Sequence, residues 1–114
     1  DDDPVIRYWS VVGLLLLEKQ AKPAIPNLKK ALDDRDEIPS LAAWAIFKAG
    51  SENFATKWML DEILENPENK MLANVLDWMD RASFSILSNI PENKVHNKGL
   101  LKDIVNRYKV RILN

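Results

Sequence analysis

Residues 5–17 have the sequence VIRYWSVVGLLLL, and the spacing of the apolar side chains in this stretch decides the fold that we expect. Pro4 fits the first turn of a helix, and the aspartates before it accept hydrogen bonds from free amides and suit the positive end of the helix dipole. We therefore predict a helix that begins at Pro4. Its stripe toward a neighbouring helix is expected to consist of Ile6, Ser10, Leu14 and Leu17.

The same helix is also apolar on the side opposite to this stripe, at Tyr8, Val11 and Leu15. A helix that is apolar all round is expected to be buried all round, whereas the end of a repeat stack ordinarily has a polar outer face. We therefore predict that these three residues dock on a preceding domain of a longer chain, or on a second copy when the chain is isolated. The start at Asp1, without a methionine, favours the same interpretation, a C-terminal piece of a longer polypeptide.

Further helices are expected along the chain, because proline, glycine and polar residues interrupt the apolar pattern at intervals. Gly50 is a typical residue at the end of a helix, and Pro39 fits the first turn of the helix that Gly50 ends. The alternation of apolar and polar side chains at residues 110–112 is typical of a strand, but the apolar residues around it recur at helical spacing, which favours a helix. The further helices are expected at about residues 24–33, 38–49, 51–65, 71–90 and 101–112, with a loop at 91–99.

Core residues recur at a nearly constant interval, which is typical of a stacked repeat. The triplet Ile6, Ser10 and Leu14 is followed 32 residues later by an equivalent triplet, and 33 residues after that by another. These later triplets are Ile38, Ala42 and Ile46, and Met71, Val75 and Met79. The pattern predicts an all-α fold, a right-handed α–α superhelix of about three antiparallel helical hairpins. We expect one domain over residues 1–114, with repeats at about 3–33, 34–68 and 69–114.

Composition limits the classes of partner. The chain has 16 basic and 17 acidic residues and a formal net charge of −1. This balance gives no bulk attraction to nucleic acid or to an anionic membrane, so both partners are disfavoured. The apolar run at residues 11–17 is much shorter than the roughly 20 residues of a membrane span. The absence of cysteine excludes disulfides and thiolate metal sites.

No residues converge on a catalytic, metal-binding or cofactor-binding site, so the sequence predicts none. His96, the only histidine, lies in the expected loop without nearby partners for a metal or for general-base chemistry. The acids within residues 33–37 lack the glycine of a calcium loop and are expected to act as turn and cap residues. Asp61, Glu62 and Glu65 are spaced as an acid–base pair would be, but a solvated helix face gives the same spacing.

Two groups of side chains are candidates for contact with a ligand. Tryptophans form platforms for sugars and bases, but Trp9, Trp44 and Trp58 lie on or beside the expected core stripes, so core packing is favoured for them. Trp78 neighbours two acids in the sequence, and its role is left open. The other candidate is a weak anion-binding or partner-binding surface made of Lys98, Lys102, Arg107 and Arg111. The solubility of a terminal helix explains these basic residues equally well.

The chain resembles the two-helix unit of HEAT repeats, most closely up to Glu65. The residues that carry this resemblance are Asp3, Ile6, Arg7, Ser10, Leu14, Pro23, Ile25, Leu28, Leu32 and Asp33. The chain departs from the family pattern in having Pro39 where the family has arginine, and in lacking a glycine after Leu17. The resemblance implies a HEAT-like stack of antiparallel helix pairs.

Residues 4–14, PVIRYWSVVGL, are also similar to the start of HEAT-like segments at the C-terminal end of some exported bacterial sulfatases. The sulfatase nucleophile motif, a cysteine or serine followed two residues later by proline and then by arginine, is absent, so no catalytic residue is carried over. This resemblance implies a non-catalytic accessory or interaction module in the periplasm or outside the cell, with a preceding catalytic domain or another protein as its partner. The alternative is a free-standing HEAT-like scaffold that binds a protein, a peptide or nucleic acid along Lys29, Lys30, Lys57 and Lys102.

Overall fold

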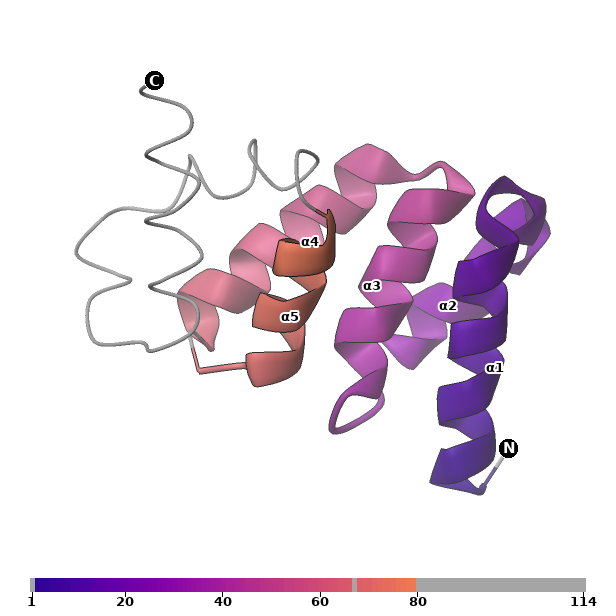
Figure 1. Cartoon of the computed structure of the whole chain (residues 1–114), viewed down its shortest axis with the longest axis horizontal. Helices are drawn as coiled ribbons and strands as arrows, with labels where there is room; N and C mark the ends of the chain where they lie inside the picture. The colour runs from indigo at the N-terminus through magenta and orange to yellow at the C-terminus, as the bar shows by residue number, and fades with distance from the viewer. Residues whose placement is uncertain (1, 67, 80–114) are drawn as a thin grey trace. The chain divides into compact units, whose positions relative to one another are not determined.

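A computed structural model describes residues 2–66 and 68–79 of the chain. These residues form α-helices and one 3₁₀ segment and contain no β-strand, so the all-α prediction is confirmed for them. The elements are α1 (Pro4–Leu17), the 3₁₀ segment η1 (Glu18–Ala24), α2 (Ile25–Ala31), α3 (Ile38–Ala49), α4 (Glu52–Glu65) and α5 (Lys70–Met79) (Figure 1). The chain divides into two units, residues 1–56 and 57–114, and the division falls within α4.

The start of α1 is as the sequence predicts. The backbone amide of Val5 donates a 2.9 Å hydrogen bond to the Asp3 carboxylate, and Pro4 occupies the first helical turn. A capping carboxylate satisfies one of the amides that have no partner inside the helix, and proline has no such amide to satisfy. The helix therefore begins at Pro4.

The connection between α1 and α2 differs from the expected polar break followed by one longer helix. Residues 18–24 form the 3₁₀ segment η1, and α2 begins at Ile25 and has only seven residues. Pro23 and Pro26 lack the amide hydrogen that an α-helix would use at these positions, so a continuous α-helix cannot run through them. The tighter 3₁₀ turns carry the chain to Pro26, which lies in the first turn of α2.

The end of α3 is set by Gly50, as the sequence predicts. Gly50 has a φ of 118°, a conformation that a residue without a Cβ adopts easily. Its amide donates to the Phe47 carbonyl at 3.1 Å, and the Ser51 amide donates to the Ile46 carbonyl at 3.1 Å. This pair of hydrogen bonds is the Schellman arrangement, which satisfies carbonyls that the ending helix leaves free.

Helix α3 is the centre of the first unit, because it contacts α1, α2 and η1. In Figure 1, α1 and α3 lie side by side. Small side chains on α3 allow this close approach, since an alanine keeps the helix axes nearer to each other than a larger residue would. The buried residues of α3 are Ile38, Ser40, Leu41, Ala42, Ala43, Ala45, Ile46 and Ala49.

The predicted core side of α1 is wrong. Val11 and Leu15 are the buried residues of α1, at 5% and 8% exposed, whereas Ile6 is 48% exposed. The prediction aligned Ile6 and Ser10 of α1 with Ile38 and Ala42 of α3, but only the α3 residues are buried. Helix α1 is apolar on both sides, so its hydrophobic pattern alone does not decide which side packs onto the rest of the unit.

In the second unit, a short turn that begins at Asn66 joins α4 to α5. The Asn69 side chain accepts a 2.9 Å hydrogen bond from the Leu72 amide and so caps the start of α5. Along α4, which begins in the first unit, Ala55, Met59 and Ile63 are buried, Trp58 is half-buried, and Phe54 and Leu64 are exposed. The buried residues of α5 are Leu72, Ala73, Val75 and Leu76. The helix expected at 101–112 and the loop at 91–99 lie outside the described residues.

Candidate interaction surfaces

The side of α1 opposite its buried residues is apolar and open. We call it the α1 outer face, and its members are Val5, Ile6, Trp9, Leu16 and Leu17, all exposed. At 100° per residue, Val5, Trp9 and Leu16 lie nearly in one line along the helix, flanked by Ile6 and Leu17. Leu16 is 76% exposed and Trp9 is 63% exposed. A continuous apolar patch of this kind is typical of an interaction site.

The residues that the sequence analysis assigned to docking do not form this open face. Val11 and Leu15 are buried, and Tyr8 is half-buried, so the prediction that they lie on an uncovered side of α1 is wrong. Helix α1 does have an uncovered apolar side, but it is the side opposite to the one predicted. Val5, Trp9 and Leu16 also recur at helical spacing, and this spacing is the feature of the sequence that indicates the exposed apolar face.

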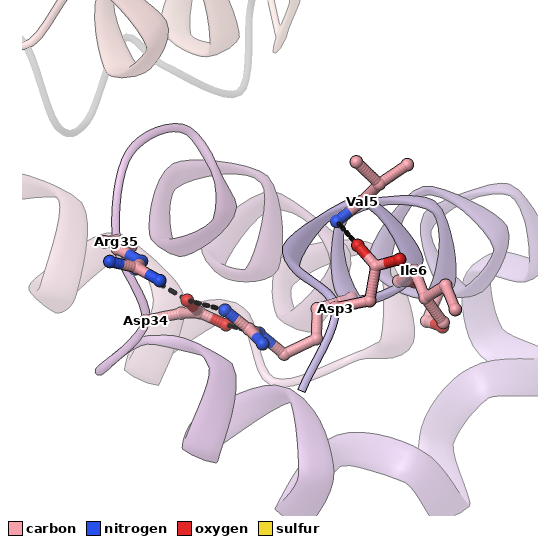
Figure 2. A network of polar contacts seen from close by, with 7 residues as sticks. Asp3, Val5, Ile6, Asp34 and Arg35 are labelled. Atoms are coloured by element: carbon pink, nitrogen blue, oxygen red, sulfur yellow. Dashed lines mark hydrogen bonds and ion pairs between the residues drawn. The ribbon is translucent and has the colours of Figure 1, made fainter. Parts of the chain in front are cut away.

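An ion pair joins α1 to the loop before α3. The Arg7 guanidinium donates from Nε to Asp34 Oδ2 at 2.7 Å and from Nη2 to Asp34 Oδ1 at 3.2 Å. The Arg35 backbone amide donates to the same carboxylate at 2.8 Å; Figure 2 shows the Asp34 carboxylate beside Arg35, and the Asp3 cap of α1. Two parallel hydrogen bonds from a guanidinium fix the carboxylate in both position and orientation.

This pairing shifts the pKa of both partners. The Arg7 hydrogen bond, and after it the Arg35 amide, lower the pKa of the Asp34 carboxyl below its ordinary value. The hydrogen bond to Asp34 raises the pKa of Arg7, and the nearby carboxylates of Asp2 and Asp3 act in the same direction. Asp34 therefore serves as the ion-pair partner of Arg7 in the fold. Within the part of the chain that the structure describes, no group of three or more acidic or histidine residues is placed to hold a metal ion.

A hollow of about 530 Å³ lies between the first turns of α1 and the start of α3. We call it the acid–aromatic hollow, and its lining residues are Pro4, Val5, Tyr8, Trp9, Asp36, Glu37 and Ile38. The Tyr8 and Trp9 rings meet edge to face, with their centroids 5.2 Å apart and their planes at 87°. Asp36 and Glu37 are exposed, and Asp36 has a φ of 59°.

A second groove, of about 330 Å³, lies between α1 and α2 and ends at the Arg7–Asp34 pair. Its α1 wall consists of Arg7, Ser10, Val11 and Leu14, and its α2 wall of Asn27, Leu28, Lys30 and Ala31. Arg7 and Asp34 neutralise each other at its end, and Lys30, the other charged residue of the groove, has no ion-pair partner among the described residues.

The exposure of the tryptophan side chains differs from the prediction that Trp9, Trp44 and Trp58 pack in the core. Trp9 was expected in the core but belongs to the α1 outer face, because the buried side of α1 is the one that carries Val11 and Leu15. Trp44 and Trp58 are half-buried, and Trp78, whose role was left open, is exposed on α5. The Lys48 ammonium lies 5.8 Å from the centroid of the Trp44 ring.

The basic residues named from the sequence are only partly described. Lys29 lies over the Phe54 ring, 4.3 Å from its centroid, and Lys57 pairs with Asp61 at 2.9 Å. The candidate anion surface of Lys98, Lys102, Arg107 and Arg111, and the single histidine His96, lie outside the described residues. Among the helices that the structure describes, none is long and apolar enough to cross a membrane.

Comparison of the chain with models of known families, with curated protein sequences and with solved structures gives no match. The class that the described residues support is therefore an all-α protein with an exposed apolar helix face in its first unit.

Proposed function

We propose that this chain is a non-catalytic, HEAT-like interaction module whose contact surface is the α1 outer face. The observation that carries the proposal is the exposure of five large apolar side chains on one side of a single helix. The only charged residue within α1 is Arg7, and it is held by Asp34 on another side of the helix. A partner can therefore cover the α1 outer face without burying an unpaired charge.

The composition of this face suits protein contact. Trp9 lies near the centre of the line that runs from Val5 to Leu16, and tryptophans near the centre of an interface often contribute the most to binding. Burying each large apolar side chain contributes about 1.5–3 kcal/mol before association costs are subtracted. A domain of the same polypeptide has a smaller association cost than a free partner, because the linkage keeps its effective concentration high.

We propose a preceding domain of the same natural polypeptide as the occupant of this face. The support is the similarity of residues 4–14 to the start of HEAT-like segments that follow exported sulfatase-like hydrolases. In that arrangement the catalytic residues belong to the preceding domain, and the module described here holds or positions it. An exported location accompanies this proposal.

Thiol labelling tests the proposal directly, because the chain contains no cysteine. Leu16→Cys places a thiol at the most exposed position of the α1 outer face. In the full-length natural polypeptide we expect this thiol to react with maleimide at least about tenfold more slowly than in the chain of residues 1–114 at low concentration. Tenfold corresponds to about 1.4 kcal/mol of docking free energy.

The matched control is Lys57→Cys, at an exposed position of α4 that does not belong to the α1 outer face. This thiol is expected to react at the same rate in both proteins. Equal rates for Leu16→Cys in the two proteins would reject the α1 outer face as a docking surface. Slow reaction of Lys57→Cys alone would place the contact on α4 and reject the α1 outer face as the docking surface.

The scaffold alternative has less support among the described residues. Of the lysines assigned to it, Lys29 contacts the Phe54 ring and Lys57 is paired with Asp61. A phosphate or an acidic peptide would have to compete with these contacts, and the near-neutral net charge adds no long-range attraction.

A further inference from the structure

We propose that the acid–aromatic hollow binds the guanidinium group of an arginine side chain from the partner protein. The hollow combines the Tyr8–Trp9 ring pair with the carboxylates of Asp36 and Glu37, and none of its lining residues is basic. This inference rests on the proposed interaction function, because the hollow shares Val5 and Trp9 with the α1 outer face. A partner that covers that face reaches the hollow without a second docking event.

The chemistry of the lining selects a cation. Aromatic rings carry negative charge on their faces, so a cation placed over Tyr8 or Trp9 is attracted to them. No hydrogen bond or ion pair within the described residues occupies the side chains of Asp36 and Glu37. Arg7, the nearest cation on α1, is already held by Asp34 and does not line the hollow.

The helix ends at this site do not reverse the preference for a cation. The first turns of α1 and α3 each present a partial positive charge of about half a unit. Four carboxylates belong to the same end of the unit: Asp2, Asp3, Asp36 and Glu37. Their combined formal charge of −4 exceeds the two partial charges together with the +1 of Arg35, which precedes Asp36 in the sequence, and Asp3 also caps α1 directly. An anion would therefore meet a net negative field.

Among cations, the shape of the site favours a guanidinium. A planar guanidinium stacks on an aromatic ring and donates two parallel hydrogen bonds to a carboxylate, whereas an ammonium acts as a point charge. A volume of about 530 Å³ accommodates an arginine side chain together with water. A metal ion is a poorer fit, since the described residues bring no third acidic or histidine side chain to the two carboxylates.

The test uses nuclear magnetic resonance on the chain of residues 1–114, with Nα-acetyl-arginine N-methylamide as the probe. The indole resonance of Trp9 is assigned by its loss in Trp9→Phe. We expect a saturable shift of this resonance and of the Val5 and Ile38 amides, and a weaker response at higher salt. The citrulline analogue has the same shape without the charge, and we expect it to give no saturable shift.

Charge-neutral variants identify the binding groups. Asp36→Asn combined with Glu37→Gln is expected to weaken probe binding by about fivefold or more, the scale of one or two partly exposed charge contacts. Asparagine suits position 36 because it tolerates a positive φ. The control is Glu52→Gln, an exposed acid of α4 outside the hollow. An unchanged Gly50 amide resonance in each variant verifies that the unit is folded.

Three outcomes would overturn the assignment: an equal response to citrulline, a stronger response to the lysine analogue, and unchanged binding by the Asp36→Asn, Glu37→Gln variant. None of them depends on docking of the α1 outer face, which is measured separately by the Leu16→Cys labelling rate. Slow labelling in the full-length polypeptide without probe binding leaves the interaction function in place and rejects the arginine site. Probe binding with fast labelling rejects the docking surface instead.

Discussion

At the scale of single residues, Glu18 is held in an unfavourable backbone conformation. It follows α1 with a φ of 52° and a ψ of −123°, and its amide donates to the Leu15 carbonyl to end the helix. Glycine adopts this conformation without the steric cost that a Cβ brings, about 1–3 kcal/mol for a strained residue.

We expect Glu18→Gly to stabilise the chain by about 1 kcal/mol. The relief of backbone strain is offset in part by the larger entropy of glycine in the unfolded chain, about 0.5–1 kcal/mol. The variant also loses the Lys48–Glu18 ion pair of 3.1 Å, whose contribution is small because both side chains are more than a third exposed. Urea denaturation followed by circular dichroism measures the change.

Glu18→Ala is the matched control for this prediction. It removes the same ion pair but keeps a Cβ, so we expect no gain in the free energy of unfolding. If alanine stabilises as much as glycine, the conformation of residue 18 is not a source of strain.

At the scale of elements, the Arg7–Asp34 pair holds α1 against the loop that leads into α3. The stability that this pair contributes to the folded chain depends on pH, and the direction follows from the pKa of Asp34. The pKa of Asp34 is lower in the folded chain than its ordinary value, chiefly because Arg7 donates to the carboxylate. The carboxylate therefore contributes stability above its unfolded pKa of about 3.9, and this contribution is lost as the pH falls through the folded pKa.

Asp34→Asn is expected to lower the urea midpoint at pH 7 and to have a progressively smaller effect below about pH 4. The amide keeps the shape of the carboxylate and its oxygen still accepts from the Arg35 backbone, but its NH2 group replaces one of the two oxygens that accept from Arg7, so the change removes the charge together with one of these hydrogen bonds. Asp61→Asn is the control, because Asp61 pairs with Lys57 while both side chains are well exposed. It is expected to change the midpoint little at any pH. A gap between wild type and Asp34→Asn that is constant from pH 7 to pH 3 would contradict the assignment.

The boundaries of elements could be predicted where one residue decides them. Pro4 with its Asp3 cap and Gly50 with its positive φ act through local geometry, which is visible in the sequence. The short α2 differs from the helix expected at about residues 24–33, because two prolines close together favour η1 before it. The apolar stripe of α3 was placed correctly, since nearly every side of that helix is buried.

At the scale of the whole molecule, the all-α class followed from periodicity, but the surface did not. Which side of α1 faces inward depends largely on how α1 meets α3, which follows it in the sequence only after η1 and α2. The acid–aromatic hollow was missed for the same reason. Tyr8 and Trp9 precede Asp36 and Glu37 by almost thirty residues, and only the packing of α1 beside α3 brings them together. The acids of this loop had been interpreted as turn residues alone.

Adding charge to the exposed side of α1 and adding charge to its buried side are expected to have opposite effects on the isolated chain. Two matched double substitutions distinguish these effects. Val5→Glu with Leu16→Glu adds charge to the α1 outer face, where both side chains are exposed. We expect the wild-type chain to self-associate weakly as its concentration rises, and we expect this variant to keep its helix content and to lose that association in sedimentation velocity. Burying five apolar side chains at about 1.5–3 kcal/mol each contributes about 8–15 kcal/mol, which overlaps the association cost of about 4–15 kcal/mol, so we expect the wild-type association to be weak.

Val11→Glu with Leu15→Glu makes the same chemical change on the buried side. Removing a buried leucine side chain alone costs about 2–5 kcal/mol, and an unpaired buried carboxylate adds to that cost. A domain with a total stability of about 5–15 kcal/mol does not withstand two such changes, so we expect this variant to lose helical circular dichroism and cooperative unfolding. If instead this variant stays folded and monomeric while Val5→Glu with Leu16→Glu unfolds, the inward side of α1 is the one that carries Val5 and Leu16, and the proposed docking surface is wrong.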